Sequence, residues 1–560
     1  MKIYRIKFNT GGKSIKVVSG TNLLEAARLA GVSISSECGG QGSCGKCRVM
    51  VEGEVSSHKS IEIKTFTSSE VEEGFRLACC TCVLSDLRVR VPESSLLADV
   101  RLQLEGDMGG VKLNPGVLAY ETHINGSVPI GFAVDLGTTT IASCLVNLAT
   151  GKVMTSAGMV NPQNAHGEDI MTRLRYAIRT REQGESQAPD LTEIIRVSLN
   201  GLLETLIKKA GVSHHQITGV CIVGNSAMTH LLLNLPVKQL ASTPYVCSSK
   251  SSFLIKAKEL RLKTAAGALV YIPPAIGGFV GSDHIAMIIA SDIDRAEKIT
   301  LGIDIGTNTE IVIRKPGMDN LASLSCPSGP AFEGAHISEG MRASKGAIEM
   351  VKFTDTGIKC RTVGGTLPRG LCGSGVIDVI AELYRWRVID ERGRMQKSNE
   401  RIRQGKEGLE FLLVPCSETV SNKDLVITQK DIDEILLAKG AIRAGIEILL
   451  EGTGTPVESV EEVVIAGAFG AYINLSNAVD IGMFPKFPNA SYKQVGNAAM
   501  TGAQMVILSC DEQKRAEDIA KKTKSIELAT TPGFNRKFAA GIMLPKLAND
   551  CHDNLFKEQL

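Results

Sequence analysis

The sequence predicts an α/β protein with a small β-rich metal-binding domain at its N-terminus, followed by a larger, internally duplicated α/β region. Three observations carry this prediction. A glycine-rich cysteine loop begins at Cys38, an Asp-x-Gly-Thr turn occurs twice after an apolar strand, and the length of 560 residues is too great for a single core. The predicted parts are a first domain, a linker, two lobes and a C-terminal tail, at residues 1–92, 93–130, 131–300, 301–545 and 546–560.

Composition excludes several classes of protein. The charges nearly cancel, with a net charge of +2, so nothing indicates a nucleic-acid partner. The first eight residues alternate like a strand and contain no signal-peptide core, and no apolar run reaches the roughly 18 residues of a membrane span. Fifteen cysteines in so long a chain then indicate reduced thiols rather than a disulfide framework. We therefore expect a soluble, cytoplasmic protein that has no membrane partner.

The first domain reads as a hairpin, a helix, a cysteine loop and further strands. Residues 2–8 and 14–18 alternate around a Thr-Gly-Gly turn, which predicts a β-hairpin. Thr21 is placed to cap a short helix that Gly31 ends. Another strand, at residues 48–51, follows the cysteine loop. This order is the β-grasp arrangement of small ferredoxins.

The cysteine loop predicts a [2Fe–2S] cluster. Cys38, Cys44 and Cys47 are spaced C-x5-C-x2-C, one residue longer at the start than the plant-type pattern. The glycines between them let backbone N–H groups turn toward the sulfides. A zinc site is the alternative, because CxxC is also half of a zinc motif, but zinc gives no reason for the glycines. The fourth ligand comes from the later run Cys79-Cys80-Thr81-Cys82.

Residues 93–130 show no clear core pattern, since glycine, asparagine and proline interrupt them repeatedly. We read them as a linker with room for one short helix. A functional tether and a purely structural connector both remain open.

The second organising feature is the duplicated turn. An apolar strand leads to Asp135-Leu-Gly-Thr-Thr-Thr, and a second leads to Asp304-Ile-Gly-Thr-Asn-Thr-Glu, about 170 residues later. The glycine lets phosphate oxygens approach backbone amides, and the threonine hydroxyls add hydrogen bonds. The aspartate at each strand end can hold Mg²⁺ or orient a water molecule. Such a turn is weak evidence alone, but its duplication after two buried strands is strong.

Two later stretches complete the pattern. Residues 463–470, Val-Val-Ile-Ala-Gly-Ala-Phe-Gly, form a third strand and glycine turn, against which a flat adenine could lie. Residues 496–503 begin a helix of small residues that is suited to close packing.

In this order, the motifs resemble the two phosphate loops, the adenosine loop and the connecting helix of the acetate and sugar kinase/Hsp70/actin superfamily. With the cysteine domain in front, the chain resembles the reductive activators of corrinoid proteins. The stretches Asn161-Pro-Gln, Gly224-Asn-Ser-Ala-Met, Gly277–Asp283, Gly329-Pro-Ala-Phe-Glu-Gly and Leu371-Cys-Gly-Ser-Gly agree with that family. The resemblance implies a two-lobed actin-like ATPase fold with duplicated α/β subdomains after the ferredoxin domain.

The resemblance also implies site residues. The cysteine after Leu-Ala is the fourth ligand in such domains, which selects Cys79, although Cys80 or Cys82 could substitute. Asp135 and Asp304 would be the catalytic carboxylates. The nucleotide-binding set would be Gly137, Thr138, Thr139, Gly306, Thr307, Asn308, Glu310, Gly467, Gly470, Lys439 and Arg443. For Lys439 and Arg443 a solvated helix face is the alternative, and Asp283 could either cap a helix or serve the nucleotide.

The expected function is ATP-dependent transfer of an electron from the cluster to the Co(II) corrinoid of a partner methyltransferase protein, restoring Co(I). The expected cofactors are the [2Fe–2S] cluster, ATP and Mg²⁺, and an upstream electron donor is implied. The oligomeric state is open, with a homodimer as one option. Two other classes remain: a small-molecule kinase with a fused ferredoxin domain, and a nucleotide-binding redox partner without ATP-driven activation.

Overall fold

The computed structural model describes residues 2–546, except 10–11, 31, 33, 35–44, 46, 93–94, 96–109, 120–127, 168, 183–189, 319, 398 and 468. The chain forms two compact units. Unit 1 contains residues 1–296, 317–321 and 495–525, and unit 2 contains residues 297–316, 322–494 and 526–560. The predicted second lobe, 301–545, is therefore divided, because residues 495–525 return to unit 1. Within the described residues, no helix has both the length and the apolar character that crossing a bilayer requires.

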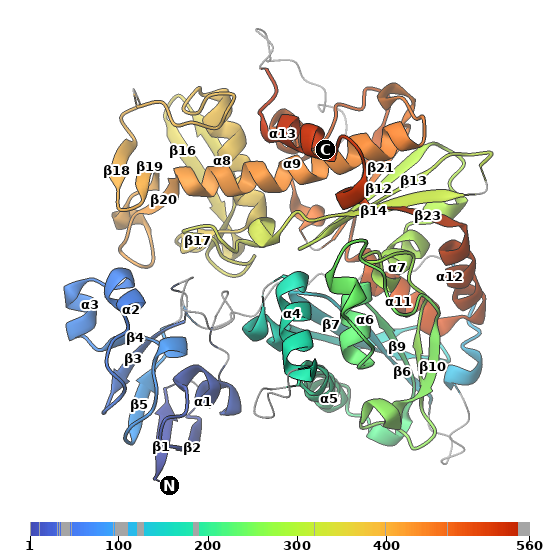
Figure 1. Cartoon of the computed structure of the whole chain (residues 1–560), viewed down its shortest axis with the longest axis horizontal. Helices are drawn as coiled ribbons and strands as arrows, with labels where there is room; N and C mark the ends of the chain where they lie inside the picture. Colours follow the sequence, from blue (N-terminus) through green and yellow to red (C-terminus); the bar gives the residue numbers. More distant parts are fainter. Residues whose placement is uncertain are drawn as a thin grey trace. The chain divides into compact units, whose positions relative to one another are not determined.

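The N-terminal part of unit 1 is a five-stranded sheet in the order β2-β1-β5-β3-β4 (Figure 1). Its strands are β1 (Ile3–Phe8), β2 (Ser14–Val18), β3 (Arg48–Glu52), β4 (Phe75–Leu77) and β5 (Leu87–Arg90), with helices α1 (Leu23–Leu29), α2 (Ser60–Thr65) and α3 (Ser68–Glu72). β1 and β2 pair antiparallel, as the hairpin prediction requires. One prediction is wrong by a residue: Asn22, not Thr21, caps α1, since its Oδ1 accepts from the Leu24 N–H at 3.0 Å.

The rest of unit 1 is a six-stranded mixed sheet with helices. The strands, in the order β10-β11-β9-β6-β7-β8, are β6 (Ile130–Leu136), β7 (Thr140–Asn147), β8 (Val153–Val160), β9 (Ile217–Val223), β10 (Phe253–Lys256) and β11 (Leu269–Ile272). The helices are α4 (Ile170–Glu182), α5 (Leu191–Ala210), α6 (Ser226–Leu232), α7 (Ser282–Ala290), α11 (Ala498–Leu508) and α12 (Cys510–Lys522). α11 packs closely on α7, because a side chain at Gly502 would overlap the backbone of Ala286.

Part of the predicted linker, residues 114–119, packs against the six-stranded sheet of unit 1 and its helices. The Asn114 N–H donates to the Leu508 carbonyl at 2.9 Å, and the Asn114 carbonyl accepts from Cys510 at 2.7 Å. Leu118, in a short 3-10 helix at Gly116–Ala119, is fully buried, and its carbonyl accepts from Thr218 at 3.1 Å. Residues 114–119 are therefore docked on the fold rather than being part of a free connector. Most other linker positions lie outside the described residues.

A second six-stranded sheet, in the order β22-β21-β12-β13-β14-β23, lies mainly in unit 2, although residues 495–496 of β22, 523–525 of β23 and Leu321 of β14 are assigned to unit 1. Its strands are β12 (Thr300–Ile305), β13 (Thr309–Arg314), β14 (Leu321–Cys326), β21 (Glu462–Ala466), β22 (Ser491–Gly496) and β23 (Thr523–Ile526). Two three-stranded sheets, β16-β15-β17 and β18-β19-β20, use β15 (Ala347–Thr354), β16 (Gly357–Thr362), β17 (Gly370–Leu371), β18 (Ile402–Gly405), β19 (Gly408–Val414) and β20 (Leu425–Thr428). The helices are α8 (Gly373–Arg385), α9 (Gln429–Gly452), α10 (Leu475–Asp480) and α13 (Phe534–Ile542). Thr428 caps α9, because its side chain accepts from the Asp431 N–H.

Candidate functional site

Three cysteines of the first domain, Cys47, Cys79 and Cys80, lie close together at one end of the N-terminal sheet. The ladder between β3 and β4 places Arg48 opposite Leu77, and the Ala78 N–H donates to the Cys47 carbonyl at 2.9 Å. This register brings the sulfur atoms of Cys47 and Cys79 to 3.3 Å from each other. A disulfide would need about 2.05 Å. Two thiolates at about 2.3 Å from one tetrahedral metal lie about 3.8 Å apart, so the pair fits metal binding better.

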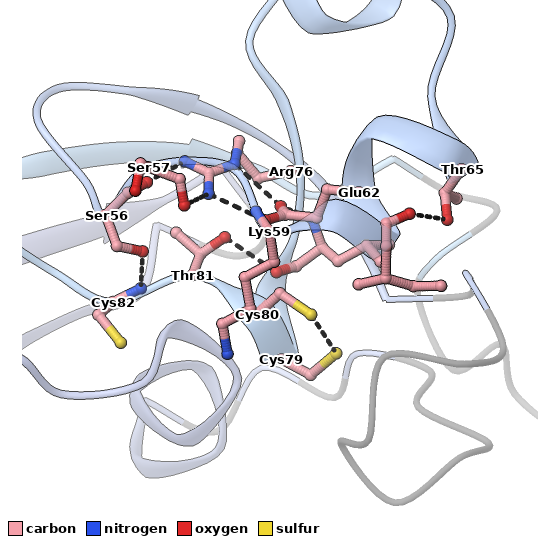
Figure 2. Close-up of polar contacts among 12 residues, drawn as sticks. Ser56, Ser57, Lys59, Glu62, Thr65, Arg76, Cys79, Cys80, Thr81 and Cys82 are labelled. Carbon is pink, nitrogen blue, oxygen red and sulfur yellow. Dashed lines mark hydrogen bonds and ion pairs between the residues drawn. The ribbon is translucent and has the colours of Figure 1, made fainter.

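The neighbouring cysteines differ in their surroundings (Figure 2). The Cys80 sulfur is buried and lies 3.8 Å from the Cys79 sulfur. Cys82 is partly exposed, its N–H donates to Ser56 Oγ at 3.0 Å, and its sulfur points away from the other two. Cys79 as the fourth ligand stays a prediction, since Cys38 and Cys44 lie outside the described residues. Among the described residues alone, no group of three metal-binding side chains occurs.

The first Asp-x-Gly-Thr loop leaves the end of β6. Asp135 is its first residue, and its Oδ2 accepts from Asn497 Nδ2 at 3.1 Å. Burial raises the pKa of the Asp135 carboxyl from 3.8 to about 6, although the hydrogen bond from Asn497 acts in the opposite direction. Asn497 also caps α11 by accepting from the Met500 N–H. A carboxylate that is destabilised by burial favours a cation or a proton beside it.

Two asparagines from distant segments fix the shape of this loop. Asn161 donates to the Gly137 carbonyl at 2.9 Å from its side chain and to the Thr139 carbonyl at 2.8 Å from its backbone. Asn225 donates to Thr138 Oγ1, also at 2.9 Å. The Asn161-Pro-Gln and Gly224-Asn-Ser stretches therefore hold the first loop in place. No role was predicted for either stretch from the sequence.

The second loop is held by one side chain of β14 and one of the segment that follows it. The Thr307 hydroxyl donates to Glu333 Oε1 at 2.6 Å, and Glu310 Oε1 accepts from Ser325 Oγ at 3.0 Å. The Gly306 N–H donates to the Asn308 carbonyl at 3.1 Å, which closes the turn. Glu333 is therefore a second carboxylate at this loop, in addition to the predicted residue Glu310, and it contacts the predicted residue Thr307. No role was predicted for Glu333, although it lies in the Gly329-Pro-Ala-Phe-Glu-Gly stretch that agrees with the family.

The glycine turn after β21 lies directly beside this loop. Asp304 is opposite Ala466 in the parallel pair of β12 and β21. Gly467 has a φ of +95°, and a Cβ there would lie 2.9 Å from Asp304 Oδ1 and closer still to a backbone carbonyl of β12. Glycine is therefore required at this position. Phe469 stacks on Phe332 with ring centroids 5.3 Å apart, which joins the glycine turn to the loop that carries Glu333.

The remaining predicted residues have partners within unit 2. Gly470 begins a short 3-10 helix, and its carbonyl accepts from Gln494 at 2.6 Å. Lys439 is fully buried on α9 and donates to the Met543 carbonyl at 2.6 Å. Burial, with a smaller effect of Arg443, lowers the pKa of Lys439 to about 7. Arg443 pairs with Glu447, one turn along the helix, at 2.6 Å.

These contacts exclude the solvated face that was the alternative for Lys439. Its role beside adenosine stays a prediction, as does that of Arg443. Asp283 lies in the first turn of α7, where a negative charge is favourable, while Gly281 occupies the capping position.

Known proteins match the chain along nearly its whole length. The 2Fe-2S iron-sulfur cluster binding domain matches residues 6–84, the RACo middle region matches residues 130–296, and the C-terminal domain of RACo, the ASKHA domain, matches residues 298–555. The corrinoid activation enzyme RamQ of Eubacterium limosum is 36% identical over 422 residues, which are 74% of this chain and 70% of that protein. The chain belongs to the RACo family of corrinoid activators.

Two further relatives agree with this family. The [Co(II) methylated amine-specific corrinoid protein] reductase of Methanosarcina barkeri is 26% identical over 446 residues, 72% of this chain and 75% of that one. A solved structure, the reductive activator for corrinoid, iron-sulfur protein, has 31% identity and a TM-score of 0.69, covering 97% of this chain and 98% of its own. The predicted fold class, a ferredoxin domain followed by an actin-like ATPase fold, is confirmed. The match to a 2Fe-2S domain also favours the cluster over zinc.

Proposed function

We propose that this RACo-family chain is an ATP-dependent reductive activator that passes one electron from its [2Fe–2S] cluster to the Co(II) corrinoid of a partner protein, restoring Co(I). The observation that carries the proposal is the union, on one polypeptide, of a 2Fe-2S domain and both RACo regions. The named activities of the two relatives from E. limosum and M. barkeri support the same reaction. An upstream donor must then reduce the cluster in each cycle.

The need for ATP follows from the redox chemistry. Plant-type [2Fe–2S] centres lie near roughly −400 mV, and the Co(II)/Co(I) couple of a corrinoid lies lower, so the transfer runs uphill. For one electron, about 59 mV corresponds to a tenfold change in the equilibrium constant. A gap of a few such steps is within what nucleotide binding and hydrolysis can supply through a conformational change.

Different residues would bind the cluster, the Mg²⁺ ion and the nucleotide. Cys38, Cys44, Cys47 and Cys79 would hold the cluster, which supplies one-electron chemistry when bound. Asp135 and Asp304 would bind Mg²⁺ or orient the attacking water in their own units. The glycine and threonine positions of the two Asp-x-Gly-Thr loops would receive the phosphates, and Gly467 and Gly470 the adenosine. Each loop is fixed by residues outside it, which suits precise positioning of a charged ligand.

The decisive experiment follows the optical spectrum of a Co(II) corrinoid protein mixed with the full-length chain, a reductant and ATP. We expect Co(I) to accumulate only when ATP is present. Cys47→Ala should still hydrolyse ATP yet leave cobalt as Co(II), whereas Asp304→Ala should keep the cluster spectrum and lose both activities. Equal Co(I) with and without ATP would refute energy coupling. Size-exclusion chromatography with light scattering separates a monomer from a homodimer.

A further inference from the structure

A buried ion pair lies behind the segment that carries Cys79. Glu62 of α2 is 0% exposed and Arg76 of β4 is 4% exposed. The Arg76 Nε donates to Glu62 Oε1 at 2.9 Å and its Nη2 donates to Oε2 at 3.1 Å, so the contact has two points (Figure 2). Charged side chains are rarely buried to this degree unless they are paired in such a geometry.

The Glu62 carboxylate also fixes backbone on both sides of the pair. Its Oε1 accepts a second hydrogen bond from the Leu77 N–H at 3.0 Å, and its Oε2 accepts from the Lys59 N–H at 2.9 Å. Leu77 is two residues before Cys79 and ends the strand that delivers it. The carboxylate thus anchors the approach of this cysteine to Cys47.

Arg76 extends the same network to the far side of the cysteine run. Its Nη1 donates to the Ser56 carbonyl at 2.8 Å, while Ser56 Oγ accepts from the Cys82 N–H. The Thr81 hydroxyl donates back to the Leu77 carbonyl at 2.9 Å. The turn at Ala78–Cys80 is therefore tied down at both ends. A buried ion pair is weak evidence for stability, because apolar residues of similar volume often stabilise a fold equally well.

We propose that Glu62 and Arg76 are positioning residues for the cluster: together they fix Cys79, and their opposite charges balance each other so that the reduction potential of the bound cluster is not displaced. Net charge and hydrogen bonding near an iron–sulfur cluster set its potential. A buried charge is screened far less than an exposed one. This proposal rests on the 2Fe-2S domain and not on the corrinoid reaction. An experiment that refutes the proposed corrinoid activation would therefore leave it unchanged.

The two charges predict shifts of opposite sign. Arg76→Gln leaves the Glu62 carboxylate unbalanced, which disfavours the added electron and lowers the potential. Glu62→Gln leaves the guanidinium unbalanced, which raises the potential. The double variant carries neither charge, and its potential should return close to that of the unsubstituted protein. Arg76→Lys keeps the charge and should shift the potential least among the Arg76 variants.

The measurement is a redox titration of the full-length, cluster-loaded protein, followed by visible absorbance and by the electron paramagnetic resonance signal of the reduced cluster. Glu52→Gln and Arg88→Gln are matched controls. These two residues face each other across β3 and β5 in the same domain, and both are exposed. Water screens their charges, so neither control should move the potential.

Shifts in the same direction for Glu62→Gln and Arg76→Gln, or shifts no larger than those of the controls, would overturn the proposal. If a single variant loses the cluster, the iron and sulfide content of the double variant decides. Recovery of the cluster there is expected, because no unpaired buried charge remains. A double variant as depleted as the single ones would overturn the proposal as well.

Discussion

Replacing Asp135 with asparagine should make the nucleotide-free protein more stable at pH 8 while it removes ATP turnover. Burial raises the pKa of this carboxyl from 3.8 to about 6. The folded state therefore binds the proton more tightly than the unfolded state does. The stability linked to this group is fully present below pH 3.8 and is lost as the pH rises through about 6. Asparagine keeps the shape of the side chain and cannot ionise, so the variant does not lose stability as the pH rises.

The size of the effect follows from the two pKa values. They differ by about 2 units, and each unit corresponds to about 1.4 kcal/mol. Asp135→Asn should therefore raise the free energy of unfolding by about 3 kcal/mol at pH 8 and by about 1 kcal/mol at pH 4.5. ATP turnover should fall by about 100-fold or more, as for the loss of a catalytic carboxylate.

Urea unfolding of the magnesium-free protein, followed by circular dichroism at several pH values, measures the gain. Asp355→Asn, at an exposed turn between β15 and β16, is the matched control and should change stability little at any pH. No gain at pH 8, or a gain that stays constant as the pH falls, would refute the reasoning that burial penalises the Asp135 carboxylate.

Four further substitutions test the cluster site and the nucleotide site. Gly467→Ala should lower ATP turnover strongly with an unchanged cluster spectrum, because the added Cβ would press on Asp304 Oδ1 and on a carbonyl of β12; normal turnover would contradict the close approach. Cys79→Ala should abolish the visible cluster absorbance and Cys80→Ala should not, and the reverse result would move the fourth ligand. Glu333→Gln should raise several-fold the Mg²⁺ concentration needed for half-maximal ATP turnover, and an unchanged requirement would leave Glu333 a structural role only.

The elements that the sequence predicted well are those with an unbroken local signal. The strands before Asp135 and Asp304 are apolar throughout and are buried on both faces, so their patterns are clear without knowledge of the fold. The helix after Thr428 carries both a cap and a long apolar face. Turn chemistry was equally local, since Gly467 lies in the glycine turn that the sequence predicted after β21 and has a positive φ there.

What the sequence could not provide were contacts between segments that are distant along the chain. Thr307 and Glu333 meet because β14 returns beside β13, and Glu62 reaches Arg76 from a helix before the strand. The local signal for Glu62 was its position three residues after Lys59, where an acidic side chain supports a helix start. That pattern indicates a cap but says nothing of a partner 14 residues later.

Asn497 offers a test of how the nucleotide site is joined to the fold. It donates to Asp135 and caps α11, and it lies three residues after the chain leaves unit 2 at Gln494. Asn497→Asp keeps the capping oxygen but replaces the donor with a second acidic group, so the pKa of Asp135 should rise above about 6. Since kcat/KM reports the ionisation of the free enzyme, the acid limb of its pH profile should move to higher pH. The melting temperature at pH 8 should fall, because a pKa of Asp135 that is raised further costs more stability once the carboxyl ionises. An acid limb that does not move would show that Asp135 need not be ionised for ATP turnover, and would remove it from the catalytic pair.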